Sequence, residues 1–218
     1  MSIIVGGVRI GVPHAKVVTW LDDPTVPQLG GNRSVRRTPV RTIVVHTTWG
    51  RLGPLFEGSG DRIGRRYVAE NVRTMQKSWD FTVDQDGTIY QQNDPARFYT
   101  WHAGAANPFS VGIEMAQRLD GTLYETQLRA TVELVSVLAR VFDVPRVVPW
   151  RRGAPDLRVL PAVRAGRLGE LRGVFGHVHF TDERGPGDPG PFPFMVLVNV
   201  NGWTGVEWSS SGAMLSPQ

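Results

Sequence analysis

Residues 123–142 have the pattern of one long helix, and this helix limits the folds that the chain can adopt. Apolar side chains recur there at helical spacing and form one broad face. Thr122 and Glu125 have the spacing of a capping box at the start of the helix, and the stretch from Asp143 to Pro145 ends it. We therefore expect a helix that is well buried in a packed core.

Short strands accompany this helix. Residues 42–46 form a β-branched run typical of a buried strand, and residues 81–91 alternate around a turn at residues 85–87 as a β-hairpin. Residues 111–115 and 173–177 have the pattern of two further short strands. Short strands that alternate with one long buried helix predict an α/β fold.

The rest of the chain is organised around these elements. Residues 1–40 carry turn signals and little periodicity, so we interpret them as an N-terminal extension that packs on a main domain formed by residues 41–218. Residues 61–76 have the pattern of a helix. Residues 146–170 are predicted to form a connection rich in Pro, Arg and Gly, long enough to be functional or mobile.

Composition limits the chemistry and the partners. The chain has no cysteine, so no disulfide supports the fold, and a metal site must use His, Asp, Glu or water. The net charge of +4 and the pI of about 9.9 favour an acidic polymer as partner, such as nucleic acid, teichoic acid, lipopolysaccharide or the bacterial wall. Arginine-rich codon usage explains the same charge equally well. The basic residues are scattered without interleaved aromatics, so we expect no nucleic-acid partner.

The N-terminus lacks a basic leader, a long apolar core and a small-residue cleavage site, so we expect no secretion signal. No apolar run reaches the roughly 18 residues that a transmembrane segment needs.

Two histidines and one aspartate stand out as candidate metal ligands. His46 and His177 each end an apolar strand, and Asp188 lies in a Gly/Pro-rich loop soon after the second. Two imidazoles and a carboxylate form a complete protein ligand set for a catalytic zinc whose fourth position holds water. Each residue also fits a structural role, because strand-end histidines often pack in cores and aspartate before Pro-Gly favours turns. Spacing alone does not select these three residues.

Glu114 is the fourth candidate, because it interrupts an otherwise apolar strand. A buried carboxylate is uncommon, since its desolvation is costly. Glu114 is therefore either a residue on the solvent face of an alternating strand or a general base.

Seven segments, taken in order, resemble motifs of one enzyme family. They are IVVHTT (43–48), FTVDQDGTIYQ (81–91), WHAG (101–104) followed by Asn107, SVGIE (110–114), YETQ (124–127), GH (176–177) and DPGPF (188–192). The chain thereby resembles the zinc-dependent N-acetylmuramoyl-L-alanine amidases, a family that includes phage lysozyme-amidases, muropeptide-recycling amidases and peptidoglycan recognition proteins.

This resemblance implies a fold, a cofactor and roles for the candidate residues. The expected fold is a mixed α/β sheet flanked by helices, with Zn²⁺ in a surface groove at the strand ends. The resemblance assigns His46, His177 and Asp188 as zinc ligands and Glu114 as the residue that activates water. The reaction implied is hydrolysis of the amide between N-acetylmuramic acid and L-alanine in peptidoglycan, with residues 41–218 as the catalytic domain.

The chain departs from the family two residues before the third ligand. Many members place Lys or Thr there to hold the oxyanion, whereas this chain has Pro186, which lacks any donor. Arg184, His179 and His102 are candidates to replace that donor, and we favour His102 because its motif matches. The third ligand is aspartate rather than cysteine, which makes the chain more similar to the bacterial and recycling-type members than to the animal recognition proteins.

Aromatic residues complete the predicted site. Trp49, Trp79 and Trp101 lie near the candidate ligands in sequence and could stack on sugar rings, although core packing is the simpler role for each. We name them, with Arg184, as candidate substrate-binding residues.

Three functions are compatible with these residues. The first is a monomeric phage-type lysin that is made in the host cytoplasm and acts on polymeric peptidoglycan after release. The second is a cytoplasmic amidase that recycles soluble anhydro-muropeptides. The third is a module that binds peptidoglycan without cutting it, which the presence of all three ligands and Glu114 disfavours.

Overall fold

The computed structural model of the protein describes residues 1–24, 26, 33–48, 78–116, 123–183 and 186–215. Its centre is a six-stranded sheet in the order β12-β5-β9-β6-β7-β3. The strands are β12 (Gly173–Gly176), β5 (Thr42–Thr47), β9 (Ser110–Met115), β6 (Phe81–Val83), β7 (Ile89–Gln91) and β3 (Val17–Thr19). All neighbours pair in parallel except β6 and β7, which form the predicted antiparallel hairpin. The expected mixed α/β sheet is confirmed.

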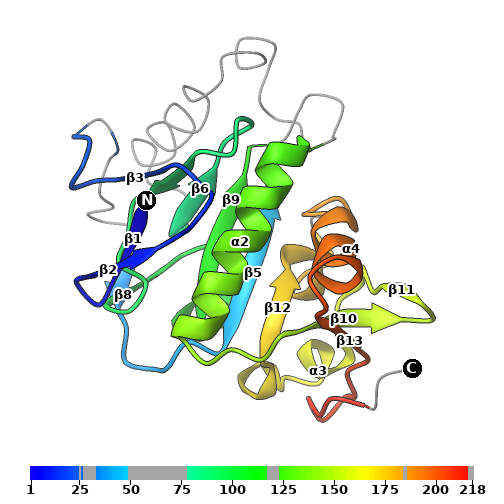
Figure 1. Ribbon diagram of the computed structural model, residues 1–218. Coiled ribbons are helices and arrows are strands. Elements are labelled where there is room, and N and C mark those ends of the chain that lie inside the picture. Colours follow the sequence, from blue (N-terminus) through cyan, green and yellow to red (C-terminus); the bar gives the residue numbers. More distant parts are fainter. Residues whose placement is uncertain (25, 27–32, 49–77, 117–122, 184–185, 216–218) are drawn as a thin grey trace.

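Two helices cover one face of this sheet. Helix α2 (Glu125–Val141) lies over β9 and β5 and follows their direction, and α4 (Phe192–Asn199) packs beside it (Figure 1). The core lies between them and the sheet, because Ile43 and Val45 of β5 and Ile113 of β9 belong to the same apolar cluster as buried residues of α2. The broad apolar face predicted for this helix is therefore buried as expected.

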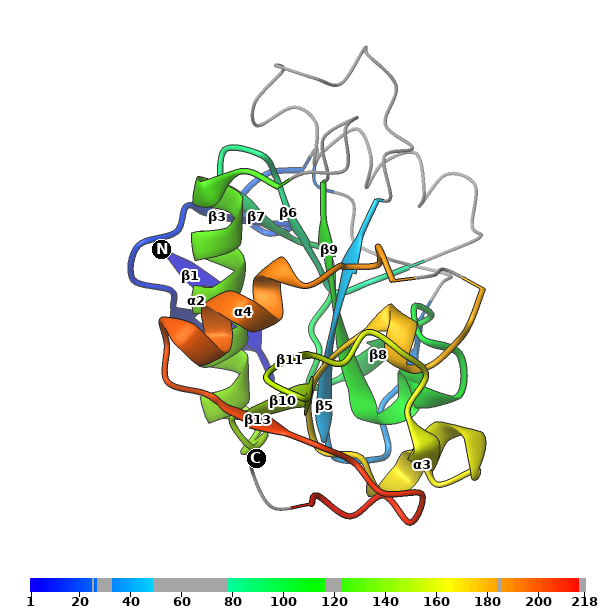
Figure 2. The same cartoon turned by 90° about the vertical axis from the view of Figure 1, so that its right-hand side faces the viewer.

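Short helical turns cover the opposite face (Figure 2). They are η1 (Gly104–Phe109), α3 (Pro161–Arg164), η2 (Leu168–Glu170) and η3 (His177–His179). Successive side chains of a strand point to opposite faces, so β9 divides its residues between the two layers. Val111 and Ile113 enter the core beneath α2, whereas Ser110, Gly112 and Glu114 face the layer of short turns.

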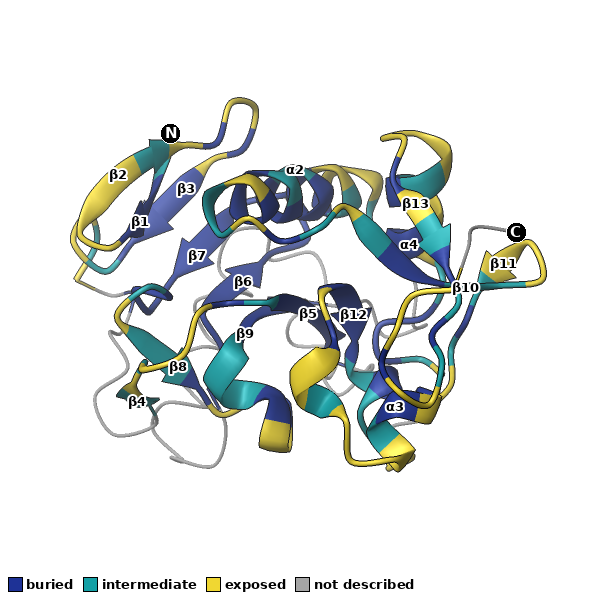
Figure 3. Ribbon diagram, turned by 90° about the horizontal axis from the view of Figure 1, so that it is seen from below, coloured by how far each residue is buried: buried dark blue, intermediate teal, exposed yellow. Residues whose placement is uncertain are grey.

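Residues 1–40 contribute strands as well as loops. The hairpin of β1 (Ser2–Val5) and β2 (Val8–Gly11) precedes β3, which forms an edge of the central sheet. Further along, β4 (Arg33–Val35) pairs with β8 (Phe98–Thr100). Figure 3 shows β1 and β3 largely buried and β2 exposed. The division into an extension and a catalytic domain at residue 40 stays a prediction.

The segment predicted as a long connection is largely structured. It contains β10 (Val147–Arg151), which pairs with β11 (Ala154–Pro155) and, in parallel, with β13 (Thr204–Val206). The prediction was wrong because β10 is completed by a strand far along the chain, which local sequence patterns do not reveal.

The start of α2 also differs from the prediction. The helix begins at Glu125, with Tyr124 at the N-cap position and no side-chain cap. The buried Gln127 side chain instead donates to the carbonyls of Val83 and Ala116, which ties the first turn to two strands. Thr122 and the helix predicted at residues 61–76 lie outside the described residues. In the described parts of the chain, no helix has the length and apolar character required to cross a bilayer.

Candidate active site

Two neighbouring parallel strands bring the candidate histidines together. His46 lies near the end of β5, and His177 follows directly after β12. Gly176 is in register with Val45, so the two histidines leave the sheet side by side. A Cβ on Gly176 would lie 2.3 Å from Cδ of Pro189, and only glycine therefore lets the loop that carries Asp188 approach this closely.

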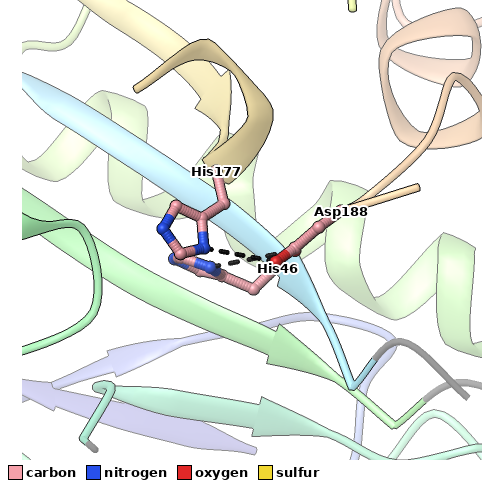
Figure 4. A group of neighbouring side chains, drawn as sticks. All are labelled: His46, His177 and Asp188. Carbon is pink, nitrogen blue, oxygen red and sulfur yellow. Dashed lines mark hydrogen bonds and ion pairs between the residues drawn. The ribbon is translucent and has the colours of Figure 1, made fainter. Parts of the chain in front are cut away.

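Asp188 completes the group from that loop (Figure 4). Its peptide bond to Pro189 is cis. Its Oδ2 lies 3.2 Å from Nδ1 of His177, and its Oδ1 lies 3.9 Å from Nδ1 of His46. One ligand atom from each of the three residues falls within 4.8 Å of the other two. Donor atoms bonded at about 2.1 Å to a tetrahedral zinc lie about 3.4 Å apart, so the group fits this ion after small side-chain adjustments. The structure therefore brings the three predicted ligands together.

Both the carboxylate of Asp188 and the backbone beside it are held by hydrogen bonds. The side chain is 1% exposed, and the backbone N–H of Thr47 donates to Oδ1 at 2.9 Å. The backbone N–H of Val178 donates to the Asp188 carbonyl at 3.1 Å, and the Thr47 hydroxyl donates to the carbonyl of Gly187 at 3.0 Å. These bonds fix Asp188 against β5, which carries His46, and against η3, which carries His177.

Glu114 lies on the same face of the sheet, one strand away from His46. The two residues are in register on β9 and β5, and paired residues of parallel strands direct their side chains to the same side. Glu114 is 7% exposed and lines the same cavity as the three candidate ligands. The alternative of a carboxylate on an open solvent face does not describe this position.

His102 lies behind His46 and uses both ring nitrogens. Its Nδ1 lies 3.0 Å from Nε2 of His46, and its Nε2 lies 3.1 Å from Oγ of Ser110. Burial lowers the pKa of His102 to about 3, and the charges of His177 and Arg36 act in the same direction. The imidazole is therefore neutral at physiological pH.

His179 is buried and bonded to the backbone alone. Its Nδ1 accepts from the N–H of Gly176 at 2.7 Å, so its Nε2 donates to the carbonyl of Asp156 at 2.5 Å. Burial lowers the pKa of His179 to about 4. This residue fixes the turn η3 from which His177 projects.

The candidate ligands open into a cavity of about 450 Å³. Glu114, His102, Trp79 and Trp101 also line it. Trp101 is 44% exposed, whereas Trp79 is buried and donates from Nε1 to the hydroxyl of Thr82 at 2.7 Å. The two other candidate substrate-binding residues, at positions 49 and 184, lie outside the described residues.

Comparison with known families is consistent with this site. The family model described as N-acetylmuramoyl-L-alanine amidase matches residues 36–191, which is more than half of the chain. The chain belongs to this amidase family. The match includes every described residue that lines the cavity.

Solved structures share the fold at low sequence identity. The Ph2119 endolysin from a Thermus scotoductus bacteriophage is 17% identical, with 84% of this chain and 97% of that chain covered at a TM-score of 0.52. The endolysin amidase LysCS from Clostridium intestinale is 15% identical, with 88% of this chain and 99% of that chain covered at a TM-score of 0.52. A Drosophila peptidoglycan recognition protein LB variant in complex with tracheal cytotoxin is 14% identical, with 83% and 92% covered at 0.52. No curated protein sequence matches the chain.

Sequence reasoning missed several residues that contact the candidate site. Ser110, Asn107 and Gly112 stood in matched motifs without a role, yet each touches His102 or its backbone. Their signal was position: Ser110 and Gly112 alternate with core residues on the strand that carries Glu114. Asp80 gave no signal, but it is fully buried and accepts from the N–H of Gly112 at 2.8 Å.

Proposed function

We propose that this protein is a zinc-dependent, endolysin-like amidase that hydrolyses the bond between N-acetylmuramic acid and L-alanine in polymeric peptidoglycan. The observation that carries this proposal is the convergence of His46, His177 and Asp188 beside Glu114 in one cavity. Membership of the amidase family supports the reaction class.

The chemistry of the donor atoms favours zinc. Two imidazoles and one carboxylate are a typical set of protein ligands for catalytic zinc, which keeps its fourth position open. When bound, such an ion polarises the substrate carbonyl and lowers the pKa of water. Backbone N–H groups of β5 and η3 hold Asp188 in place beside the two histidines, which supports a ligand group that is arranged before an ion binds.

Glu114 supplies the proton transfers. Its carboxylate accepts a proton as water attacks the carbonyl carbon of the lactyl amide. The same carboxyl then donates that proton to the alanine nitrogen as the C–N bond breaks. The products are a lactyl carboxylate on the glycan and a stem peptide with a free alanine amine. Its place beside His46 in register supports this role.

The glycan strand is assigned to the Trp101 side of the cavity. The indole of Trp101 is 44% exposed, and aromatic faces pack well on the apolar faces of sugars. Trp79 is a buried part of the cavity wall and is fixed by its bond to Thr82, so we expect it to determine the shape of the cavity rather than to stack on sugar. A cavity open to solvent also suits a polymeric substrate, because the glycan strand extends beyond the cavity at both ends.

The similarity to endolysins favours polymeric peptidoglycan, rather than a soluble muropeptide, as the substrate. Two of the similar structures are endolysins, and the similarity covers 97% and 99% of their chains. The basic character of this chain adds attraction to an anionic envelope. We further propose that the protein reaches the wall after release from the cell that makes it.

Digestion of purified sacculi with mass analysis of the products tests the function. We expect intact glycan strands and free stem peptides that begin with alanine, and Glu114→Gln as the matched inactive control. Release of reducing sugars would contradict the proposal. Parallel digestion of soluble anhydro-muropeptides separates the two amidase roles, because faster cleavage of the soluble substrate would indicate recycling.

A further inference from the structure

We infer that His102 is a positioning residue that holds His46 with its Nδ1 directed to the metal, through a hydrogen-bond chain that ends at Ser110. This inference rests on the proposed function, because it concerns the ion that the amidase would use. It replaces the expectation that His102 holds the oxyanion.

The positions of the protons follow from the contacts of His46. Its Nδ1 faces Asp188 Oδ1 at 3.9 Å, while its Nε2 lies 3.0 Å from Nδ1 of His102. An imidazole that offers the Nδ1 lone pair to a cation carries its proton on Nε2. His46 therefore donates to His102. With Nδ1 of His102 accepting, its proton lies on Nε2 and is donated to Oγ of Ser110 at 3.1 Å.

The ring of His102 fits a slot that glycine creates. A Cβ on Gly112 would lie 2.7 Å from Cγ of His102, so no other residue leaves room for the imidazole there. The backbone N–H groups of His102 and Ala103 both donate to Oδ1 of Asn107, at 3.0 and 2.6 Å. The ring is thus held by its backbone on one side and by β9 on the other.

Buried polar contacts keep the slot rigid. Arg36 donates from Nη2 to the Ser110 carbonyl at 2.7 Å and from Nη1 to the Pro108 carbonyl at 2.7 Å. Asp80 accepts from the N–H of Gly112 at 2.8 Å. Strand β9 is therefore fixed at both residues that touch His102, and Ser110 is a stable end point for the chain.

This arrangement assigns His102 to the ligand and not to the substrate. An imidazole has two ring nitrogens, and both of those in His102 are used within the chain. Partners that orient a ligating histidine typically contribute about 10- to 100-fold to metal affinity. An oxyanion donor would instead act on turnover, by about 10²- to 10³-fold, with the metal still bound.

Zinc affinity measured by competition with a chromophoric chelator distinguishes the two roles. We expect His102→Phe to weaken zinc binding about 10- to 100-fold and Ser110→Ala to weaken it less. Saturating zinc should restore most of the turnover of His102→Phe on sacculi. His14→Phe, a change at an exposed histidine, is the matched control and should leave affinity and turnover unchanged.

Wild-type affinity in a folded His102→Phe variant would overturn the inference, as would turnover that stays low at saturating zinc. Nitrogen-15 spectra of the wild-type zinc form provide a test that needs no variant. They should show protons on Nε2 of His46 and on Nε2 of His102, and a proton on Nδ1 of either ring would overturn the inference. Absence of zinc binding by the wild type would overturn the proposed function as well, whereas the other outcomes leave it standing.

Discussion

His177 and His179 lie two residues apart on the same short turn, yet their surroundings differ completely. Nδ1 of His177 faces the carboxylate of Asp188 at the cavity, whereas both nitrogens of His179 are bonded to backbone groups in the interior. His46 also faces Asp188, whereas the nitrogens of His102 contact the side chains of His46 and Ser110. We therefore infer the role of each imidazole from the partners of its ring nitrogens, and propose that one histidine of each pair supports the other.

The largest effect should separate the two histidines of η3. His177→Ala removes a proposed ligand, so we expect loss of zinc and a fall in sacculus digestion of at least about 10⁴-fold. His179→Gln should retain stoichiometric zinc. Both variants are checked by metal analysis after dialysis and by digestion rates. Retention of zinc and activity by His177→Ala would show that His177 is not a ligand.

A second test separates the carboxylates of the cavity. Glu114→Gln keeps the shape of the side chain but cannot accept the proton, so activity should fall about 10³-fold while zinc stays bound. Asp188→Asn should instead lose zinc, because the amide is a weak ligand. Zinc content and turnover are measured on the same preparations. Full activity in Glu114→Gln would show that another group is the base.

Acid stability tests the buried half of the comparison. Burial lowers the pKa of His179 from 6.5 to about 4, so between these values the unfolded chain binds a proton that the folded chain does not. The free energy of unfolding therefore falls as pH drops through this window, by about 3 kcal/mol from this residue. His179→Gln should flatten that dependence in urea unfolding of the metal-free protein. If the free energy of unfolding depends on pH in the same way in His179→Gln and in the wild type between neutral pH and pH 4, the buried neutral state of His179 is contradicted.

The smallest effect concerns the tryptophans. Trp101→Ala should raise KM for sacculi about 5- to 10-fold with little change in kcat, because an exposed stacking surface is lost. Trp79→Phe should mainly lower the free energy of unfolding, since it removes the buried bond to Thr82. Kinetics and urea unfolding are measured on both variants. A higher KM in Trp79→Phe and a lower free energy of unfolding in Trp101→Ala would contradict these roles.

Much of this architecture could be predicted from local patterns. The β-branched run that ends in His46, the hairpin before β9 and the apolar face of α2 follow from residue periodicity. The ligand group was predicted only through resemblance, because spacing along the chain does not show that residues 46, 177 and 188 meet. Their meeting depends on parallel pairing of β5 with β12.

The remaining features depend on contacts between distant segments. The pairing of β10 with β13 joins residues 147–149 to 204–206, so residues 146–170 resembled a loop when considered alone. The partners of His102 were equally hidden, since Ser110 and His46 approach it only when β5 and β9 lie side by side. Hydrogen-bond partners and burial are products of tertiary structure, and they distinguish a ligand from its support.

Anomalous diffraction at the zinc edge, from crystals of the zinc-loaded protein, would locate the metal. We expect one peak within about 2.0–2.2 Å of Nδ1 of His46, a ring nitrogen of His177 and a carboxylate oxygen of Asp188. A fully active protein whose zinc lies elsewhere, or which holds no zinc, would contradict it.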